Sequence, residues 1–144
     1  MTVFSNTSTQ DTKGTVYVVD DDDAIRDSLR WLLEANDYKV ELYDSGESFI
    51  AKYDPNAIAV LVLDVRMPGM SGLEVQEHLL ARKADLPIIF ITGHGDVPMA
   101  VEAVKKGAWD FLQKPIDPGK LLTLVDAALR QRQSVIARRQ YCQQ

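Results

Sequence analysis

The chain has 144 residues, of which 46% are hydrophobic, and its formal net charge is −5. This length and composition indicate one soluble domain with its own core, and the absence of any long apolar run argues against a membrane span. Residues 130–144 hold four arginines and no acid, so the rest of the chain carries a formal net charge of −9 and is not expected to bind nucleic acid. Cys142 is the only cysteine, which excludes an internal disulfide and favours a cytoplasmic location.

The two ends of the chain differ in composition from the middle. Residues 1–13 are polar and rich in serine and threonine, without the positive and apolar regions of a signal peptide, so we expect a flexible leader. Residues 14–130 are predicted to form the single domain. Residues 131–144 are basic and rich in glutamine, and we expect them to begin a linker to a further domain.

Strand and helix patterns alternate along the predicted domain. The predicted strands are residues 16–19, 39–43, 60–63, 88–91 and 109–112, and a helical pattern with one apolar face follows each of them. Such alternation implies right-handed crossovers between parallel strands. The sequence therefore predicts an α/β fold with a doubly wound, five-stranded parallel sheet, (βα)5, in the flavodoxin-like order 2-1-3-4-5.

Capping residues and apolar spacing define the helices more closely. Asp22 or Asp23 is expected to cap the first helix, Ser71 and Glu74 form a capping box for the third, and Asp96 is expected to cap the fourth. The side chains predicted to face the sheet are Val75, Leu79 and Leu80 from the third helix and Val97, Val101 and Val104 from the fourth.

Polar side chains stand where the predicted strands end. Asp20 and Asp21 follow the first strand and Asp64 follows the third, while Thr92 and Lys114 follow the fourth and fifth. The carboxyl ends of parallel strands meet at one edge of a sheet, so we expect these five side chains to lie close together. Two carboxylates about 5 Å apart repel by roughly 3 kcal/mol at an effective dielectric of about 20, so three of them require a counter-ion. Oxygen ligands select a hard cation, and Mg²⁺ is the expected one.

This combination of groups suggests a particular chemistry. A carboxylate beside Mg²⁺, with a hydroxyl and a lysine converging on the same point, provides what an aspartyl-phosphate needs: a nucleophile, charge neutralisation and donors for phosphoryl oxygens. Thr92 or Lys114 taken alone is equally well explained as a turn or surface residue, whereas the whole set at successive strand ends favours a site. His78 and His94 lack the partners that a transition-metal site would need.

Four motifs resemble those of response-regulator receiver domains, which have the CheY-like fold. The motifs are Val-Val-Asp20-Asp21-Asp, Leu-Asp64-Val-Arg-Met-Pro68-Gly-Met-Ser-Gly72, Ile-Thr92-Gly-His-Gly and Lys114-Pro115. The string from Thr92 to Ala100 is similar to the FixJ-like subgroup of two-component transcriptional regulators, whose members usually carry a C-terminal helix-turn-helix domain. The resemblance covers residues 14–130.

The resemblance implies a phosphoacceptor and a metal site. Asp64 would accept a phosphoryl group from a sensor histidine kinase. Asp20, Asp21 and Asp64 would hold Mg²⁺, and Arg66 would contribute its backbone carbonyl. Beyond self-phosphorylation and self-dephosphorylation, no enzymatic activity is expected.

The resemblance also implies a conformational switch. Thr92 and Lys114 would bind the phosphoryl group, Thr92 and Phe111 would change conformation, and Lys114-Pro115 would be a cis peptide bond. Phenylalanine replaces the tyrosine that is usual at position 111, so no hydroxyl there can report the orientation of the ring. Phosphorylation is expected to produce a homodimer through the fourth helix, fifth strand and fifth helix. DNA would be bound only by a C-terminal domain outside this chain.

Two other functions fit parts of the sequence. An apolar strand followed by Asp20-Asp21-Asp22 also satisfies the Asp-x-Asp motif of haloacid-dehalogenase-like phosphatases, which would place the nucleophile on Asp20. Those enzymes normally need a cap domain and a late pair of acids, and residues 95–100 supply only one acid. The second alternative is a stand-alone receiver that acts by binding another protein.

Overall fold

The structure is a computed structural model that describes residues 13–142, with side chains described for residues 13–138. The predicted leader lies outside the described residues except for Lys13, whose backbone N–H donates to the carbonyl of Asp37 at 2.8 Å. The end of the predicted linker, residues 143–144, also lies outside them.

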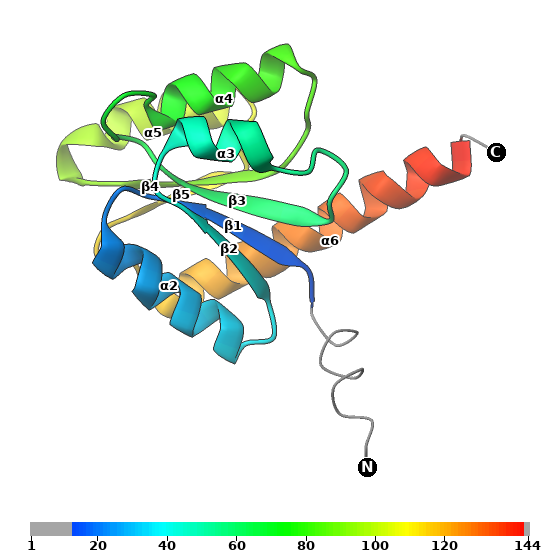
Figure 1. Ribbon diagram of the computed structural model, residues 1–144, viewed down its shortest axis with the longest axis horizontal. Helices are drawn as coiled ribbons and strands as arrows, with labels where there is room; N and C mark the ends of the chain where they lie inside the picture. The colour runs from blue at the N-terminus through cyan, green and yellow to red at the C-terminus, as the bar shows by residue number, and fades with distance from the viewer. Residues whose placement is uncertain (1–12, 143–144) are drawn as a thin grey trace.

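A five-stranded parallel sheet forms the centre of the molecule, in the spatial order β2-β1-β3-β4-β5 that the sequence predicts (Figure 1). The strands are β1 (Thr15–Val19), β2 (Lys39–Tyr43), β3 (Ala59–Asp64), β4 (Ile88–Thr92) and β5 (Asp110–Gln113). Since all neighbours pair in parallel, the strand ends that carry Asp64 and Thr92 share one side of the sheet. We call this side the carboxyl edge and the opposite side, where the strands begin, the amino edge.

Helices cover both faces of the sheet. They are α2 (Asp23–Ala35), α3 (Gly46–Lys52), α4 (Gly72–Ala81), α5 (Val97–Lys105) and α6 (Pro118–Cys142), with a short 3-10 helix η1 (His94–Asp96) before α5. Helices α2 and α6 pack on one face, and α3, α4 and α5 pack on the other (Figure 1). Successive residues of β1 point to opposite faces of the sheet. Val18 packs with residues of α2 and α6, and Val19 packs with residues of α3, α4 and α5. The predicted doubly wound fold is confirmed, and none of the helices in the described part has the length and hydrophobicity that crossing a bilayer requires.

Local hydrogen bonds fix the starts of the helices that flank the strand ends. Asp22 caps α2, because its carboxylate accepts from the N–H groups of Ala24 and Ile25. Ser71 and Glu74 form the predicted reciprocal capping box at α4. Gly72 lies so close to the end of β3 that a Cβ there would come within 2.2 Å of the carbonyl oxygen of Asp64. Only glycine therefore allows α4 to begin directly beside that strand end.

The predictions of which residues on α4 and α5 face the sheet are partly wrong. Leu80 and Val101, which were expected to face the sheet, are 49% and 38% exposed. On α5 the buried residues are instead Ala100 and Ala103. Their small side chains lie in the core on the sheet face that α3, α4 and α5 cover, and the side-chain amide of Gln76 on α4 donates to the carbonyl of Ala103 at 2.9 Å in a buried position. Position on the face that packs against the sheet, rather than the hydrophobicity of individual α5 residues, therefore decides which side chains are buried.

Helix α6 continues well past residue 130, where the sequence predicts the domain to end. The side chain of Arg132 is only 1% exposed. Its guanidinium donates to the carbonyls of Ala57 and Pro55 at 3.0 and 2.7 Å. It also donates to the carboxylate of Asp85 at 2.7 Å. These partners lie in the loops that precede β3 and β4, so the first turns of the predicted linker pack against the amino edge of the domain.

Candidate functional site

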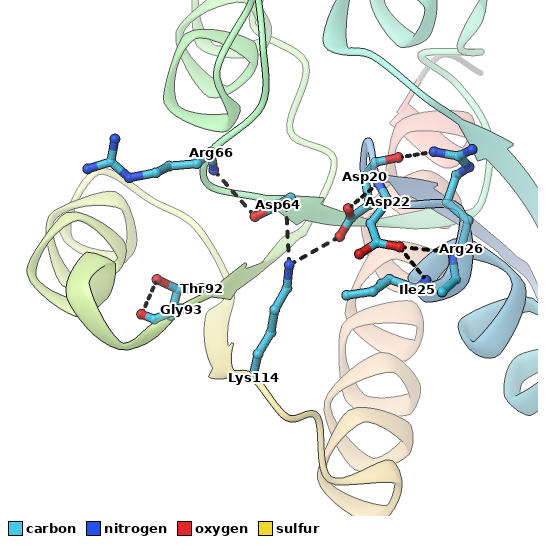
Figure 2. Close-up of polar contacts among 10 residues, drawn as sticks. Asp20, Asp22, Ile25, Arg26, Asp64, Arg66, Thr92, Gly93 and Lys114 are labelled. Atoms are coloured by element: carbon cyan, nitrogen blue, oxygen red, sulfur yellow. Dashed lines mark hydrogen bonds and ion pairs between the residues drawn. The ribbon is translucent and has the colours of Figure 1, made fainter.

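Three carboxylates converge at the carboxyl edge of the sheet. One oxygen from each of Asp20, Asp21 and Asp64 lies within 4.8 Å of the others. Asp20 directly follows β1 and Asp64 ends β3, and these two strands are paired neighbours, which is why the side chains meet (Figure 2). Asp20 and Asp64 are buried, whereas Asp21 is exposed. The structure therefore brings together the three acids that the sequence selects as metal ligands.

Lys114 reaches into the same cluster from the segment after β5. Its Nζ lies 3.4 Å from Asp64 Oδ2 and 3.6 Å from Asp20 Oδ2 (Figure 2). The peptide bond that joins it to Pro115 is cis. The lysine thus supplies one positive charge to two buried carboxylates, which leaves the cluster negative when all three acids are ionised.

The excess negative charge of the acid cluster has two consequences, an oxygen without a hydrogen-bond donor and raised carboxyl pKa values. Asp20 Oδ1 accepts from the N–H of Asp22 at 2.9 Å, but Asp20 Oδ2 is buried and accepts no hydrogen bond from any described residue. Burial and the nearby charge of Asp20 raise the pKa of Asp64 to about 6, although Lys114 acts in the opposite direction. Burial also raises the pKa of Asp20. A buried acceptor without a donor, among acids that resist ionisation, fits a site that takes a further cation.

The donor set matches a hard cation of the Mg²⁺ type. The three acids offer only oxygen atoms, and Mg²⁺ accepts one or two carboxylates while keeping several waters for a phosphate to replace. The backbone N–H of Arg66 donates to Asp64 Oδ1 at 3.3 Å, so this oxygen is already engaged and Oδ2 faces the cluster. Arg66, whose carbonyl is a predicted ligand, lies in the loop that immediately follows β3.

The two predicted switch residues lie on neighbouring strands beside the cluster. Thr92 ends β4 and is fully buried, and its hydroxyl donates to the carbonyl of Gly93 at 3.2 Å (Figure 2). Phe111 is partly buried in β5 and packs against the same core cluster as α5, with Phe90 as its register partner. Thr92 therefore lies at the end of the strand next to β3, and Phe111 lies on β5, the edge strand beyond it.

Asp96, which was expected to cap α5, makes no side-chain capping bond to that helix in the described structure. Its carboxylate instead accepts a hydrogen bond from Arg66 Nε at 2.6 Å. This ion pair joins the loop after β3 to the 3-10 helix after β4. The two residues are 30 positions apart, so local capping patterns could not reveal the pairing.

Arg26 is a further residue at this edge that the motifs do not single out. It lies in the first turn of α2, and its Nη1 donates to the backbone carbonyl of Asp20 at 2.5 Å (Figure 2). Its Nη2 forms an ion pair with Asp23. The signal that could have found it is a basic residue one helical turn after a run of four aspartates.

Comparison with known proteins agrees with the fold. Residues 16–126 match the model of the response regulator receiver domain family. Over 133 residues the chain is 50% identical to the phosphoglycerate transport system transcriptional regulatory protein PgtA of Salmonella typhimurium, which covers 90% of this chain and 31% of PgtA. Over 120 residues it is 45% identical to the transcriptional regulatory protein FixJ of Bradyrhizobium diazoefficiens, which covers 83% of this chain and 58% of FixJ.

Solved structures give the same result. The response regulator StyR superposes with a TM-score of 0.85 at 43% sequence identity, and the match covers 90% of this chain and 65% of StyR. The chain therefore spans less than two thirds of the length of PgtA, FixJ and StyR.

Proposed function

This chain belongs to the response regulator receiver domain family, and we propose that it is a phosphorylation-activated switch whose Asp64 accepts a phosphoryl group from a sensor histidine kinase. The resemblance to FixJ-like regulators is confirmed by the identity to FixJ. Members of this family are in general signalling domains rather than enzymes. The observation that best supports the proposal is Asp64 itself, which is buried at the end of β3 with Lys114 3.4 Å away and two further acids within 4.8 Å.

The chemistry that we propose uses the cluster as a phosphoryl acceptor. Asp20, Asp21 and Asp64, with the carbonyl of Arg66, would hold Mg²⁺, which when bound neutralises charge on the carboxylates and on the phosphoryl oxygens. An ionised oxygen of Asp64 attacks phosphorus, and the bond between phosphorus and the donor's leaving group breaks. Lys114 binds a phosphoryl oxygen as a point charge. Its positive charge, like that of the metal, favours the ionised form of Asp64.

The conformational response that we propose begins at Thr92. Rotation of its hydroxyl from the carbonyl of Gly93 to a phosphoryl oxygen would draw the start of η1 toward Asp64. A phosphoryl group brings a charge of about −1.5 to −2 and about one to three new hydrogen bonds. Reversing a 1:99 equilibrium requires about 5.5 kcal/mol of differential stabilisation. Phe111 is already partly buried, so its further inward rotation would supply less than the ~1.5–3 kcal/mol of complete burial, and the phosphoryl contacts would supply the larger share.

The output that we propose is transcriptional. PgtA and FixJ are named as transcriptional regulators, and both are much longer than this chain. We propose that a helix-turn-helix domain follows residue 144 in the parent protein and binds DNA, and that residues 131–144 begin the connection to it. Phosphorylation would produce a homodimer through α5, β5 and α6, where Val101 is exposed and Trp109 and Phe111 are only partly buried.

The phosphoacceptor is tested with a small phosphodonor and Mg²⁺. Wild-type protein should be labelled on Asp64, and Asp64→Asn should not be labelled although it folds, because the amide keeps the shape of the carboxylate and lacks its nucleophilic charge. Asp27→Asn, on the exposed side of α2, is a control that should be labelled as strongly as the wild type. Labelling mapped to Asp20 would instead favour the phosphatase alternative, and undiminished labelling of Asp64→Asn would contradict the proposal.

The dimer is tested by sedimentation with and without beryllofluoride, which mimics the phosphoryl group. We expect a monomer without it and a dimer with it, and Phe111→Ala should prevent the change. Trp31→Ala is a matched control, because Trp31 is an exposed aromatic residue on α2, away from the proposed surface. A monomer in both states at tens of micromolar, or equal effects of the two substitutions, would contradict a dimer through this surface.

A further inference from the structure

The guanidinium of Arg26 is held at the acid cluster without contacting the cluster's unsatisfied oxygen. The side chain is only 14% exposed and bends back over the loop between β1 and α2. Its Nη1 donates to the backbone carbonyl of Asp20 at 2.5 Å (Figure 2). Its Nη2 pairs with Asp23. Asp20 Oδ2 nevertheless accepts no hydrogen bond from the described residues. The guanidinium thus contacts a peptide carbonyl and the exposed Asp23 rather than the buried carboxylate of Asp20.

That peptide group joins two proposed metal ligands. The N–H of Asp20 donates to the carbonyl of Tyr43 at 3.2 Å, so β2 holds one side of the residue and Arg26 holds the other. A planar peptide unit turns as a whole, so its orientation sets the directions in which the side chains of Asp20 and Asp21 leave the backbone. Asp21 is exposed, and none of the contacts found in residues 13–138 holds its carboxylate. Its position therefore depends on the backbone that Arg26 fixes.

Charge and positioning make opposite predictions for Arg26. A positive side chain near a cation site repels the cation, so charge alone predicts that removal of Arg26 tightens Mg²⁺ binding. Loss of the hydrogen bond to the Asp20 carbonyl would instead free the peptide and let Asp21 move away from Asp64. We propose that Arg26 is a positioning residue for the metal site, and that the order it imposes on Asp20 and Asp21 outweighs its own repulsion of the cation. This inference rests on the proposed Mg²⁺ site.

The test is calorimetric titration of the unphosphorylated chain with magnesium chloride. Arg26→Ala should raise the Mg²⁺ dissociation constant by about fivefold or more, as expected for loss of one charged hydrogen bond. The dissociation constant of Arg26→Lys should lie between those of the wild type and Arg26→Ala, because an ammonium can still reach the Asp20 carbonyl but cannot contact Asp23 at the same time. Arg30→Ala is the matched control, since it removes the same charge from a half-exposed position on α2 where the ion pair with Asp27 is 4.0 Å long. Its dissociation constant should be unchanged or slightly lower.

A second measurement separates positioning from general damage to the site. Phosphorylation of Arg26→Ala by a small phosphodonor should be slow at low Mg²⁺ concentration and should return to the wild-type rate at saturating Mg²⁺. Equal or tighter Mg²⁺ binding by Arg26→Ala, or a rate that saturating Mg²⁺ does not restore, would overturn this inference and leave the proposed function standing. Failure of the wild type to bind Mg²⁺ would overturn both.

Discussion

The two edges of the sheet each bury a charged side chain, and they treat it in opposite ways. At the amino edge, Arg132 donates to three acceptors at 2.7–3.0 Å, one of them a carboxylate. At the carboxyl edge, one oxygen of the buried Asp20 accepts no hydrogen bond from the described residues, and Lys114 Nζ stands 3.6 Å away. The chain alone completes the coordination of the first charge but not that of the second.

This difference separates an anchor from a binding site. A buried charge whose donors are all satisfied by the chain holds structural elements together, as Arg132 joins α6 to the loops before β3 and β4. A buried charge without enough partners destabilises the fold until another group supplies them. In the function that we propose, the carboxyl edge therefore carries the chemistry, and the amino edge, at the other ends of the same strands, carries part of the stability.

The largest effect on stability is expected from removing Arg132, whose hydrogen bonds at the amino edge are all made by the chain. Arg132→Met should lower the free energy of unfolding by about 2–4 kcal/mol, because two part-buried hydrogen bonds from a buried charged donor, worth about 1.5–3 kcal/mol each, are lost and water replaces them only in part. Asp85 is half-exposed, so its carboxylate regains water and adds little to the loss. Urea denaturation measures the change.

The control is Arg130→Met, two residues earlier on α6. Arg130 pairs with Asp126 at 3.0 Å but is 78% exposed, and such surface pairs contribute at most about 1 kcal/mol. Equal losses for the two substitutions would show that Arg132 is not an anchor.

The carboxyl edge was predictable from sequence because its residues are marked by their place in the chain. Asp20, Asp64 and Thr92 each stand where an apolar run stops, and parallel pairing is sufficient to bring such positions together. Lys114 follows the last strand in the same way. The predicted strand order alone places these residues at one edge, so the cluster could be predicted together with the fold and without knowledge of side-chain packing.

The amino edge was not predictable in the same way, because its partners are joined only by the folded chain. Arg132 occupies the apolar face of α6 in register with Leu129 and Ile136, and this spacing is a signal that the sequence does contain. Its partners Pro55 and Ala57, however, lie 77 and 75 residues away. The exposure of Val101 and the pairing of Asp96 with Arg66 escaped prediction for the same reason.

The next largest effect is the pH dependence of stability that the acid cluster at the carboxyl edge causes in the absence of Mg²⁺. The pKa of Asp64 is raised from 3.8 to about 6, so the folded protein binds this proton more tightly than the unfolded chain does. Raising the pH from 3.8 to about 6 therefore lowers the free energy of unfolding by up to about 3 kcal/mol. In the presence of EDTA, Asp64→Asn should be about as stable as the wild type at pH 4 and up to about 3 kcal/mol more stable at pH 7.

Comparing wild type and variant at each pH removes the contribution of the other carboxylates. A gain for Asp64→Asn that stays the same at both pH values would contradict the raised pKa.

The smallest expected effect is the stabilisation of the fold by Mg²⁺, which would supply the partner that the buried acids at the carboxyl edge lack. Mg²⁺ at ten times its dissociation constant should stabilise the wild type by about 1.4 kcal/mol, measured by thermal unfolding against potassium chloride of equal ionic strength. Asp21→Asn should lose this stabilisation while being no less stable than the wild type without Mg²⁺, because Asp21 is exposed and its removal relieves like-charge repulsion. Arg132→Met should keep the full Mg²⁺ effect on its lower baseline, since its contacts lie at the opposite edge. If Asp21→Asn were stabilised as much as the wild type, Mg²⁺ would be acting elsewhere, and if Arg132→Met lost the effect, the two edges would be coupled rather than independent.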